Sequence, residues 1–355
     1  MAKKNVAVLF GGVSSEHDVS LASAENVIRS IPDDKYNVYK VGITKDGRWF
    51  KYDGPTDLKN SKWESHESCV SACILPDRGR RGITVFENDG VKTIDIDCVF
   101  PVLHGKNGED GTIQGLMELA GIPCVGCDMI SSAMSMDKAV TNTIMDYAGI
   151  PQAKWTAINK YEYSRNAQEL LDKAVDYLSL PIFVKPACAG SSVGVSKAVD
   201  MESLRKAMDI AFAHDDKVVL EQTIVGREIE CAVLGNYELQ VATPCEIIPG
   251  SDFYDYDSKY IDDTTTIELV AKLTQEQVDR LKKLAEKTYK ALGCSGLTRV
   301  DFFVSHDGEQ MYINEVNTIP GFTPISMYPK MFENSGKPQS QLVSELIELA
   351  IEKSK

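Results

Sequence analysis

Apolar and polar residues alternate along the first 125 positions in a way that predicts strands separated by amphipathic helices. Residues 5–10 (NVAVLF) form a short, nearly continuous apolar run that ends at Gly11-Gly12, as a buried parallel strand would. Residues 20–31 then repeat apolar positions with a helical period. The same patterns predict strands at 38–43 and 97–103 and a helix at 111–120. Strands that alternate with helices indicate an open α/β domain with a parallel sheet over roughly residues 1–125.

The remaining patterns are more mixed. Residues 51–95 carry many polar residues, Gly and Pro, and we interpret them as peripheral hairpins or loops. From Ser131 one amphipathic helix is expected to run to Gly149, where Pro151 follows as an ordinary stop signal. Further along, the patterns predict these elements: strands at 180–186, 193–197, 228–234 and 239–247, a polar loop at 250–263, a helix at 274–292, a hairpin at 298–316 and a helix at 339–353.

Size, charge and cysteine usage limit the function classes. At 355 residues the chain exceeds the size at which one core usually keeps growing, so two or three domains are expected. The 38 Lys and Arg against 52 Asp and Glu give a net charge of −14, which argues against nucleic-acid or anionic-membrane partners. No run approaches the roughly 18 apolar residues of a membrane span. Nine scattered cysteines favour a reducing, cytoplasmic compartment, and Cys124 and Cys127 are expected to be plain buried thiols.

Two carboxylates and an amide near the end of the chain form the most informative constellation. The 298–316 segment has β-branched and aromatic runs on either side of a turn, as a hairpin would. A loop with an odd number of residues would place Asp301 opposite Glu315, whereas a two-residue turn would place Asn314 there. Asn317 would share the face of Glu315 because side chains two apart in a strand point the same way. Such hard oxygens suit Mg²⁺ or Mn²⁺, although two solvated acids on an exposed hairpin fit the same pattern.

Groups that suit phosphate oxygens occur in the middle of the chain. Lys185 ends an apolar strand, and the loop after it contains Gly190, Ser191 and Ser192. This segment supplies a point cation, backbone N–H groups and hydroxyls, although it could also be only a hairpin turn. Lys138 is a second candidate cation. The loop is not a Walker A sequence, which disfavours a P-loop fold.

Acidic residues at strand ends are candidates for the rest of a nucleotide. Glu221 closes an apolar strand and could bind an adenine together with the backbone at Ile224. Glu228 could reach a ribose. Because acids beside strand ends are common, a purely structural role fits these residues equally well.

Three further segments carry chemistry that a ligand could use. Glu16 opens a helix after Gly11-Gly12 and could bind an ammonium group or complement the helix dipole. The dinucleotide fingerprint G-x-G-x-x-G is absent there. His104 begins a glycine-rich loop at a strand end, where open α/β sheets bind ligands. Residues 253–260 (FYDYDSKY) suit a lid that excludes water, or tyrosines that pack on a neighbouring domain.

In this order and spacing, seven segments resemble the D-alanine–D-alanine ligase family, whose members have the ATP-grasp fold. The segments are LFGGVSSEHDVSL, LHGKNGEDGTIQG, SMDK, VKPACAGSSVGVSK, FYDYDSKY, TRVDFF and NEVNTIPGFTPISMYP. The likeness runs from Val6 to the C-terminal helix. It implies an α/β (α+β overall) protein of three domains: an N-terminal open parallel-sheet substrate domain (1–126), a central ATP-grasp subdomain (127–223) and a C-terminal subdomain with the metal site and lid loop (224–355).

The resemblance also implies an activity and the residues that serve it. The activity is ATP-dependent ligation of two D-alanines through a D-alanyl phosphate, for peptidoglycan precursors, by a cytoplasmic homodimer. ATP would be bound by Lys138, Lys185, Ser192, Glu221, Gln222, Ile224, Glu228, Phe253 and Phe303. Two Mg²⁺ or Mn²⁺ ions would be held by Asp301, Glu315 and Asn317. The catalytic residues would be Glu16, Ser191, Tyr260, Arg299 and Gly321. The other substrate-binding residues would be His104, Lys259, Ser326 and Met327.

Within this family the chain departs from common patterns at three places. Ala189 sits where many members carry an acid, Gln222 where some have lysine, and Pro324-Ile325 where Ser-His often precedes Ser326. The first two concern ATP affinity, and the third concerns the second amino-acid subsite.

Other functions remain open at this point. Lys259-Tyr260 favours a D-amino acid over D-lactate as the second substrate, and the apolar Met327 favours D-alanine over D-serine. A D-alanine–D-serine ligase of the vancomycin-resistance type is the alternative, because the LHGKNGEDG and ALGCSG segments resemble that group as well. A nucleotide-binding module without ligase activity would have a broken metal triad or no lid. A dehydrogenase would rest on Gly11-Gly12 alone.

Overall fold

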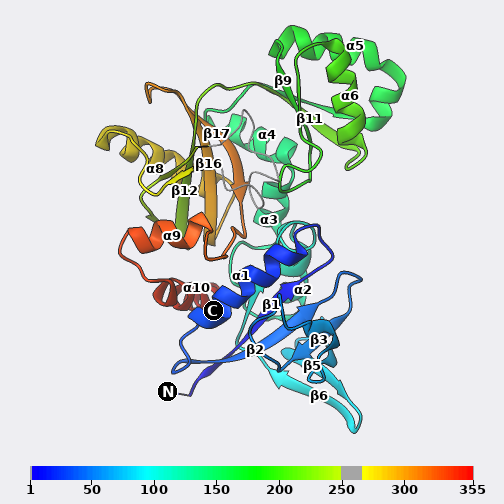
Figure 1. Ribbon diagram of the computed structural model, residues 1–355, viewed down its shortest axis with the longest axis vertical. Helices are drawn as coiled ribbons and strands as arrows, with labels where there is room; N and C mark the ends of the chain where they lie inside the picture. Colours follow the sequence, from blue (N-terminus) through cyan, green and yellow to red (C-terminus); the bar gives the residue numbers. More distant parts are fainter. Residues whose placement is uncertain (1, 249–265, 355) are drawn as a thin grey trace.

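The computed structural model describes residues 2–248 and 266–354, and its strands form three sheets that follow one another along the chain (Figure 1). The first sheet has seven strands in the order β6-β5-β4-β3-β2-β1-β7. Its strands are β1 (Lys4–Gly11), β2 (Tyr36–Ile43), β3 (Trp49–Tyr52), β4 (Val70–Ile74), β5 (Gly82–Glu87), β6 (Gly90–Asp95) and β7 (Cys98–Val102). The helices of this region are α1 (His17–Ser30) and α2 (Thr112–Ala120), with a short 3-10 turn, η1 (Trp63–Ser65).

Only part of the first sheet is parallel. β1 pairs in parallel with β2 and β7, as the apolar runs predict, but β2 to β6 pair antiparallel. The 51–95 segment therefore extends the parallel sheet as a set of hairpins. Trp63 anchors it by packing edge-on against Phe10, with 5.0 Å between ring centroids. Gly42 makes room for this indole, because a Cβ at that position would lie 2.2 Å from the Trp63 ring.

The helix expected from Ser131 to Gly149 is two helices, α3 (Met129–Met136) and α4 (Lys138–Ala148). Asp137 breaks the run with extended backbone angles (φ −86°, ψ 103°). Its carboxylate accepts hydrogen bonds from the backbone N–H groups of Ala139 and Val140 and also pairs with Lys217. The break is therefore an N-cap, which places Lys138 in the first turn of α4.

The second sheet has four strands in the order β10-β9-β11-β8, with antiparallel neighbours. The strands are β8 (Trp155–Asn159), β9 (Ile182–Pro186), β10 (Ser196–Ala198) and β11 (Lys217–Gln222), and two helices, α5 (Lys160–Leu178) and α6 (Met201–Phe212), lie against them. Figure 1 shows these helices at one end of the molecule. The buried residues of this unit pack with one another and form a core of their own.

The third sheet is antiparallel and runs β15-β14-β12-β16-β17, with β13 paired to β12. Its strands are β12 (Arg227–Gly235), β13 (Gln240–Val241), β14 (Cys245–Ile248), β15 (Thr266–Glu268), β16 (Gly296–Val304) and β17 (Met311–Asn317). The helices are α8 (Gln275–Ala291), α9 (Met327–Asn334) and α10 (Gln339–Lys353). The single strand expected at 239–247 is thus two, β13 and β14, because Pro244 interrupts the ladder.

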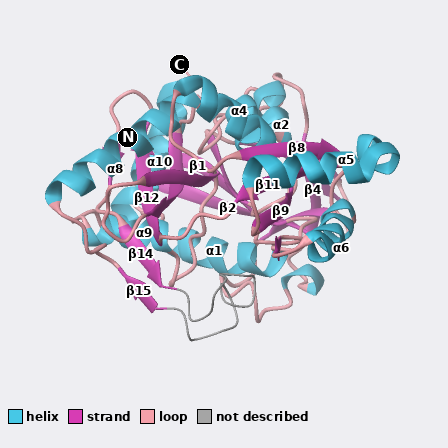
Figure 2. Cartoon of the chain, turned by 90° about the horizontal axis from the view of Figure 1, so that it is seen from above, coloured by secondary structure: helices cyan, strands magenta, loops and turns pink. Residues whose placement is uncertain are grey.

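One core joins the first and third sheets. Val8 and Phe10 of β1 belong to the same buried cluster as Leu346 of α10 and Tyr328 of α9. Tyr36 adds a polar link because its hydroxyl donates to Glu348 of α10 at 2.7 Å. Seen from above, helices lie along most of the outside of the molecule, while β14 and β15 lie at one margin (Figure 2). The first and third sheets are therefore held to each other by apolar packing, whereas the second sheet has a separate core.

All nine cysteines are free thiols. Cys127 is buried and Cys124 is half-buried, so the expectation of plain buried thiols holds fully only for Cys127. Among the described residues, none of the helices has the length and apolar character needed to cross a bilayer.

The cap at Asp137 gives a testable prediction about stability. Asp137→Ala should lower the free energy of unfolding by about 1 kcal/mol, because two N–H groups at the start of α4 lose their acceptor. Asp137→Asn keeps an acceptor oxygen and loses only the charge facing Lys217, so it should retain more than half of that stability. Thermal and urea melts of the three proteins measure this. Equal losses in both variants would show that the ion pair, and not the cap, stabilises the break.

Candidate active site

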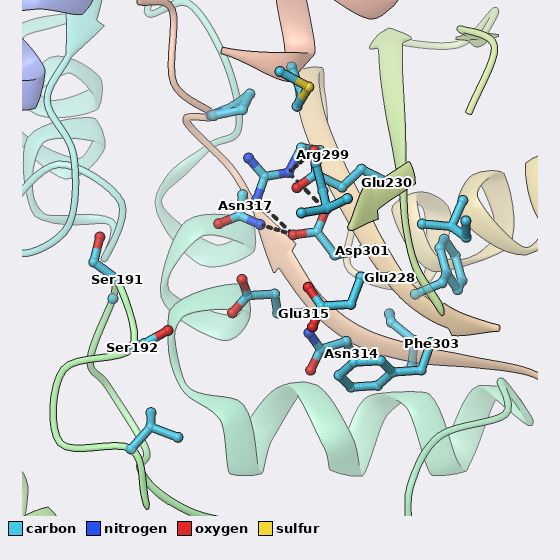
Figure 3. Close-up of a pocket in the computed structure, with 18 of the residues that line it drawn as sticks. Ser191, Ser192, Glu228, Glu230, Arg299, Asp301, Phe303, Asn314, Glu315 and Asn317 are labelled. Carbon is cyan, nitrogen blue, oxygen red and sulfur yellow. Dashed lines mark hydrogen bonds and ion pairs between the residues drawn. The ribbon is translucent and has the colours of Figure 1, made fainter. Parts of the chain in front are cut away.

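A cavity of about 940 Å³ lies where the three sheets meet. The first region contributes Glu16, His104 and Glu109 to its lining, the second contributes Lys185 and the serine loop, and the third contributes one face of its sheet. Figure 3 shows Ser191 and Ser192 on one side of this space and the acidic face of the third sheet on the other. The cavity therefore brings together residues that are far apart in the sequence.

Strand alternation gives the third sheet one apolar and one polar face. Ile229, Phe302 and Val300 point to a buried core that includes side chains of α8. Glu230 and Asp301, on the other face, line the cavity. Glu230 lies directly opposite Asp301 on the neighbouring strand, and Asp301 lies opposite Glu315 on the next. Three carboxylates therefore stand in one row across β12, β16 and β17.

The pairing of Asp301 with Glu315 depends on a β-bulge. The hairpin loop comprises residues 305–310, an even number, so it is not the odd-numbered loop that would by itself place Glu315 opposite Asp301. The ladder instead shifts register between Asp301 and Phe302, since Phe302 pairs with Ile313. Asn314 is the extra residue on β17. The predicted partners do face each other, but for a different physical reason.

Arg299 binds the middle carboxylate of the row. Its Nε and Nη2 donate to the two oxygens of Asp301 at 2.8 and 2.7 Å, and its Nε also lies 3.3 Å from Glu230 Oε2 (Figure 3). Burial by itself lowers the pKa of Arg299, but the charges of Asp301 and Glu230 outweigh it and leave the pKa well above the ordinary value. Asn317 sits opposite Arg299, and its Nδ2 donates to Asp301 at 2.9 Å.

Two lysines lie on the other side of the cavity. Lys185 Nζ is 2.6 Å from Glu221 Oε2, across the pair of strands β9 and β11. Burial lowers the pKa of Lys185, but Glu221 more than offsets it and the pKa is raised. Lys138 Nζ donates to the carbonyl of Ala189 at 2.7 Å, and burial lowers its pKa even though Glu315 acts in the opposite direction. The predicted adenine contact Glu221 is thus also the ion-pair partner of a predicted phosphate contact.

The serine loop reaches the first region of the chain. Ser191 donates through Oγ to Glu16 Oε1, and both Ser191 and Ser192 have left-handed backbone angles (φ 48° and 58°). Gly190 permits this close approach, because a Cβ there would lie 3.0 Å from Glu16 Oε2. This hydrogen bond joins the serine loop to the residue that precedes α1, and both residues line the cavity.

Glu109 is a cavity residue that sequence reasoning did not single out. Its carboxylate accepts the backbone N–H groups of Gly105, at 2.9 Å, and Ile319, at 3.3 Å. Burial, and then the nearby charge of Glu16, raise the pKa of Glu109 to about 8. The glycine-rich loop after His104 was the available signal, but nothing in the local pattern showed which acid would turn inward.

His104 is buried, and both of its ring nitrogens are used by the protein. Nδ1 lies 3.1 Å from the carbonyl of Ile319, and Nε2 lies 2.9 Å from Ser23 Oγ. Burial lowers its pKa, which favours the neutral ring. His104 lines the cavity and at the same time fixes the segment that leads to Gly321.

The segment after β17 forms the remaining wall. Gly321, Ser326 and Met327 all line the cavity, and Ser326 occupies the N-cap position of α9. Ser326 Oγ accepts the Thr323 N–H at 3.0 Å. A Cβ on Gly321 would lie 2.7 Å from Ser326 Oγ, so a larger residue here would displace this hydroxyl.

Most of the other predicted residues also meet here. Those that line the cavity are Ser192, Gln222, Ile224, Glu228 and Phe303. Glu228 and Phe303 are direct cross-strand partners, which sets the carboxylate beside the ring. Three predicted residues, Phe253, Lys259 and Tyr260, lie outside the described residues. Glu230 was missed, although its position two residues after Glu228 in one strand could have revealed it.

The architecture and the site define a class of protein. The fold is the ATP-grasp fold, in which a four-stranded and a six-stranded antiparallel sheet share one cavity. Lysines lie on one side of this cavity and carboxylates on the other. Within the described residues, no group of three or more His, Cys, Asp or Glu side chains is arranged to hold a metal ion. The predicted metal ligands Asp301, Glu315 and Asn317 are not such a group, because the third ligand is the amide of an asparagine.

Comparison with known proteins is consistent across sequence and structure. The family described as D-ala D-ala ligase C-terminus matches residues 144–348, and that described as D-ala D-ala ligase N-terminus matches residues 5–127. A D-alanine–D-alanine ligase of Caldicellulosiruptor bescii is 49% identical over 100% of this chain and 97% of its own length, and one of Acetivibrio thermocellus is 47% identical over 99% and 96%. The chain belongs to the D-alanine–D-alanine ligase family.

Two solved structures are similar over nearly the whole chain. The VanG D-Ala:D-Ser ligase from Enterococcus faecalis has a TM-score of 0.90 at 41% identity, covering 98% of this chain and 100% of that one. The D-alanine–D-alanine ligase from Coxiella burnetii has a TM-score of 0.85 at 36% identity, covering 100% and 95%.

The raised pKa of Glu109 gives a prediction about pH. Between 4.5, its ordinary value, and about 8, the folded protein holds a proton that the unfolded chain releases. The free energy of unfolding should therefore fall as the pH rises from about 5 to about 8. Glu109→Gln cannot titrate and should lose less stability over that window.

Thermal melts of the metal-free protein across this pH range measure the effect. Glu118→Gln, which changes an exposed glutamate on α2, is the matched control and should behave like the wild type. The same pH slope in Glu109→Gln and the wild type would contradict the assignment of the raised pKa to Glu109.

Proposed function

We propose that the protein joins two D-alanines to D-alanyl-D-alanine at the expense of ATP, in the synthesis of peptidoglycan precursors. The observation that carries the proposal is the arrangement of charge around one cavity. Lys138 and Lys185 face it from one side, and the carboxylate row with Arg299 faces it from the other. This arrangement suits a reaction in which a phosphoryl group moves to a carboxylate between the two walls.

The reaction needs two steps because a carboxylate is a poor acyl donor. ATP would first phosphorylate the carboxylate of one D-alanine to an acyl phosphate, and the amine of the second D-alanine would then attack it and release phosphate. Lys138 and Lys185 would neutralise phosphate charge in the first step. Glu221, Gln222 and the Ile224 backbone would contact the adenine region, with Glu228 at the ribose.

Asp301, Glu315 and Asn317 have the donor chemistry that Mg²⁺ or Mn²⁺ prefers. Two carboxylates face each other across the ladder, and Asn317 gives its Nδ2 to Asp301, which leaves its amide oxygen free to bind elsewhere. We propose that these residues hold two such ions, which would supply charge neutralisation for the triphosphate.

The amino-acid substrates would lie between Glu16 and the segment 319–327. The Glu16 carboxylate, held by Ser191, suits the ammonium group of the first D-alanine. Arg299 and the backbone N–H of Gly321 would stabilise the oxyanion of the tetrahedral intermediate. Ser326 suits the carboxylate of the second D-alanine. Lys259 and Tyr260 stay predicted members of this site.

A second candidate function is D-alanine–D-serine ligation, which the likeness to the VanG enzyme favours. Met327 supports D-alanine instead, because it is an apolar, buried residue in the cavity wall and offers nothing to a hydroxyl. An apolar pocket rejects an added hydroxyl only weakly, by roughly 10²-fold or less. We therefore propose D-alanine as the preferred second substrate.

Three further expectations belong to the same proposal. The division into domains at 223/224 is supported by the position of the second and third sheets along the chain, whereas α3 and α4, which the division at 126/127 places with the second sheet, contribute Met134 and Met145 to the core of the third. A cytoplasmic location suits an enzyme with free thiols that uses ATP. The homodimer stays a prediction.

The test of the proposed function is product formation. ATP, Mg²⁺ and D-alanine should give ADP, phosphate and D-alanyl-D-alanine, identified by mass. With equal D-serine added, the D-alanine dipeptide should stay in excess. Predominant D-alanyl-D-serine would assign the protein to the second candidate function, and no turnover of any D-amino acid would refute the ligase proposal.

Arg299 gives a second prediction for this site. Arg299→Met should lose at least about 10²-fold in turnover, with a much smaller change in substrate KM, because the oxyanion exists only after attack. Arg227→Met is a matched control, since Arg227 makes the same bidentate contact to Glu246, at 2.7 and 2.6 Å. Arg227 also lines the cavity, next to the predicted ribose contact Glu228, so this variant should lose stability and change the KM for ATP, while turnover at saturating substrate stays near that of the wild type. Full turnover in Arg299→Met would contradict the role.

A further inference from the structure

One carboxylate of the row, Glu230, has no task in the proposed reaction. It is 7% exposed, lines the cavity and lies between Cys245 on β14 and Asp301 on β16. A buried carboxylate costs free energy unless a cation or donors compensate it. Its cationic partner is Arg299, whose Nε lies 3.3 Å from Glu230 Oε2. The function of Glu230 is therefore to be sought in what it does to Arg299.

Arg299 has two carboxylate partners, of which only one is a proposed metal ligand. It holds both oxygens of Asp301, at 2.8 and 2.7 Å, yet Asp301 is also a proposed metal ligand. A divalent cation on Asp301 would weaken the attraction between this carboxylate and the guanidinium and would repel the guanidinium directly. Arg299 would then need another anchor to remain close to Gly321, where the oxyanion develops.

Glu230 is placed to be that anchor. It approaches Arg299 at Nε, the nitrogen nearest the chain, on the side away from Glu315 in the row of strands. An anchor at Nε leaves the terminal Nη groups available to a substrate. Ala232, the cross-strand neighbour of Arg299, is small, so the guanidinium has room to lie toward Glu230.

We propose that Glu230 is the positioning residue of Arg299. Glu230 holds the guanidinium at Nε, so that the Nη groups of Arg299 can donate to the oxyanion while Asp301 binds the metal ions. The proposal rests on the proposed function. Glu230 would act through Arg299, without touching substrate or metal. This makes it separable by experiment from the residues that bind ATP.

A second buried glutamate–arginine pair, Glu246 with Arg227, serves as a control for Glu230 with Arg299. Glu246 binds Arg227 through both oxygens and, like Glu230, is 7% exposed. It pairs with Ile229, one position before Glu230 along β12, and both Glu246 and Arg227 line the cavity as Glu230 does. Glu246→Gln therefore removes an equally buried carboxylate from the same cavity wall, but one whose arginine partner is Arg227 and not Arg299.

The test is a double-mutant cycle in the dipeptide-forming assay. Glu230→Gln should lower turnover on the order of 10-fold, with the KM for ATP changed less than about twofold. In the Arg299→Met background, the same substitution should change turnover by less than about twofold, because a residue that acts through Arg299 has nothing left to position. The effect of Glu246→Gln on turnover should be the same in the wild-type and the Arg299→Met backgrounds, because Glu246 acts on Arg227. Glu230→Ala provides a second variant if Glu230→Gln does not fold.

A readout that does not need turnover completes the test. The Nε–H of Arg299 can be observed by nitrogen-proton NMR and assigned by its loss in Arg299→Met. It should shift in Glu230→Gln and stay in place in Glu246→Gln, with and without Mg²⁺.

Unchanged turnover in Glu230→Gln, or an equal loss in the Arg299→Met background, would overturn the positioning role and leave the ligase proposal intact. An unshifted Nε–H would overturn it as well. If the wild type makes no dipeptide from D-alanine, the proposed function fails and the positioning role fails with it, whatever the NMR shows.

Discussion

The arrangement of charge on one face of the third sheet is the constraint on which the site depends. Three carboxylates on adjacent strands repel one another, and taking them out of water adds to the cost. Arg299 compensates Asp301 and Glu230 from within the same face, while Lys138 lies close enough for Glu315 to influence its pKa. The carboxylates therefore require cations on both sides, and a triphosphate with divalent metal ions is a ligand that meets this requirement.

The packing of the sheets decides how rigidly each wall of the cavity is held. The first and third sheets share one apolar core through α9 and α10, so Glu16 and Arg299 belong to parts of the chain that are packed together. The second sheet has its own core and reaches the first through polar contacts such as that between Ser191 and Glu16. The wall that would bind the phosphates is thus attached more loosely than the wall that would bind the metal ions. This arrangement suits an enzyme that must admit ATP and release ADP.

Patterns within one segment predicted much of this structure, and contacts between distant segments account for what they missed. The buried strand Lys4–Gly11 follows from its apolar run, and helix Gln339–Lys353 follows from its period. The break at Asp137 was missed because the apolar period continues across it, while Lys217, far along the chain, helps to hold the cap. Glu109 was missed because one of the two backbone N–H groups that bind its carboxylate belongs to Ile319, far along the chain. Helix Met327–Asn334 was missed as well, within a segment that was interpreted only for its substrate contacts.

The bulge at Asn314 decides which residues of β17 face Asp301. From the loop outward, Val304 pairs with Met311 and Phe302 with Ile313, so an unbroken ladder would place Asn314 opposite Asp301. The extra residue moves Glu315 into that place. From there on, β17 continues in the new register, and Asn317 comes to lie opposite Arg299. A one-residue change of register exchanges the two faces of a strand. Because of the bulge, Ile313, which precedes Asn314, lies in the core, whereas Asn317, which follows it, presents its amide to Asp301.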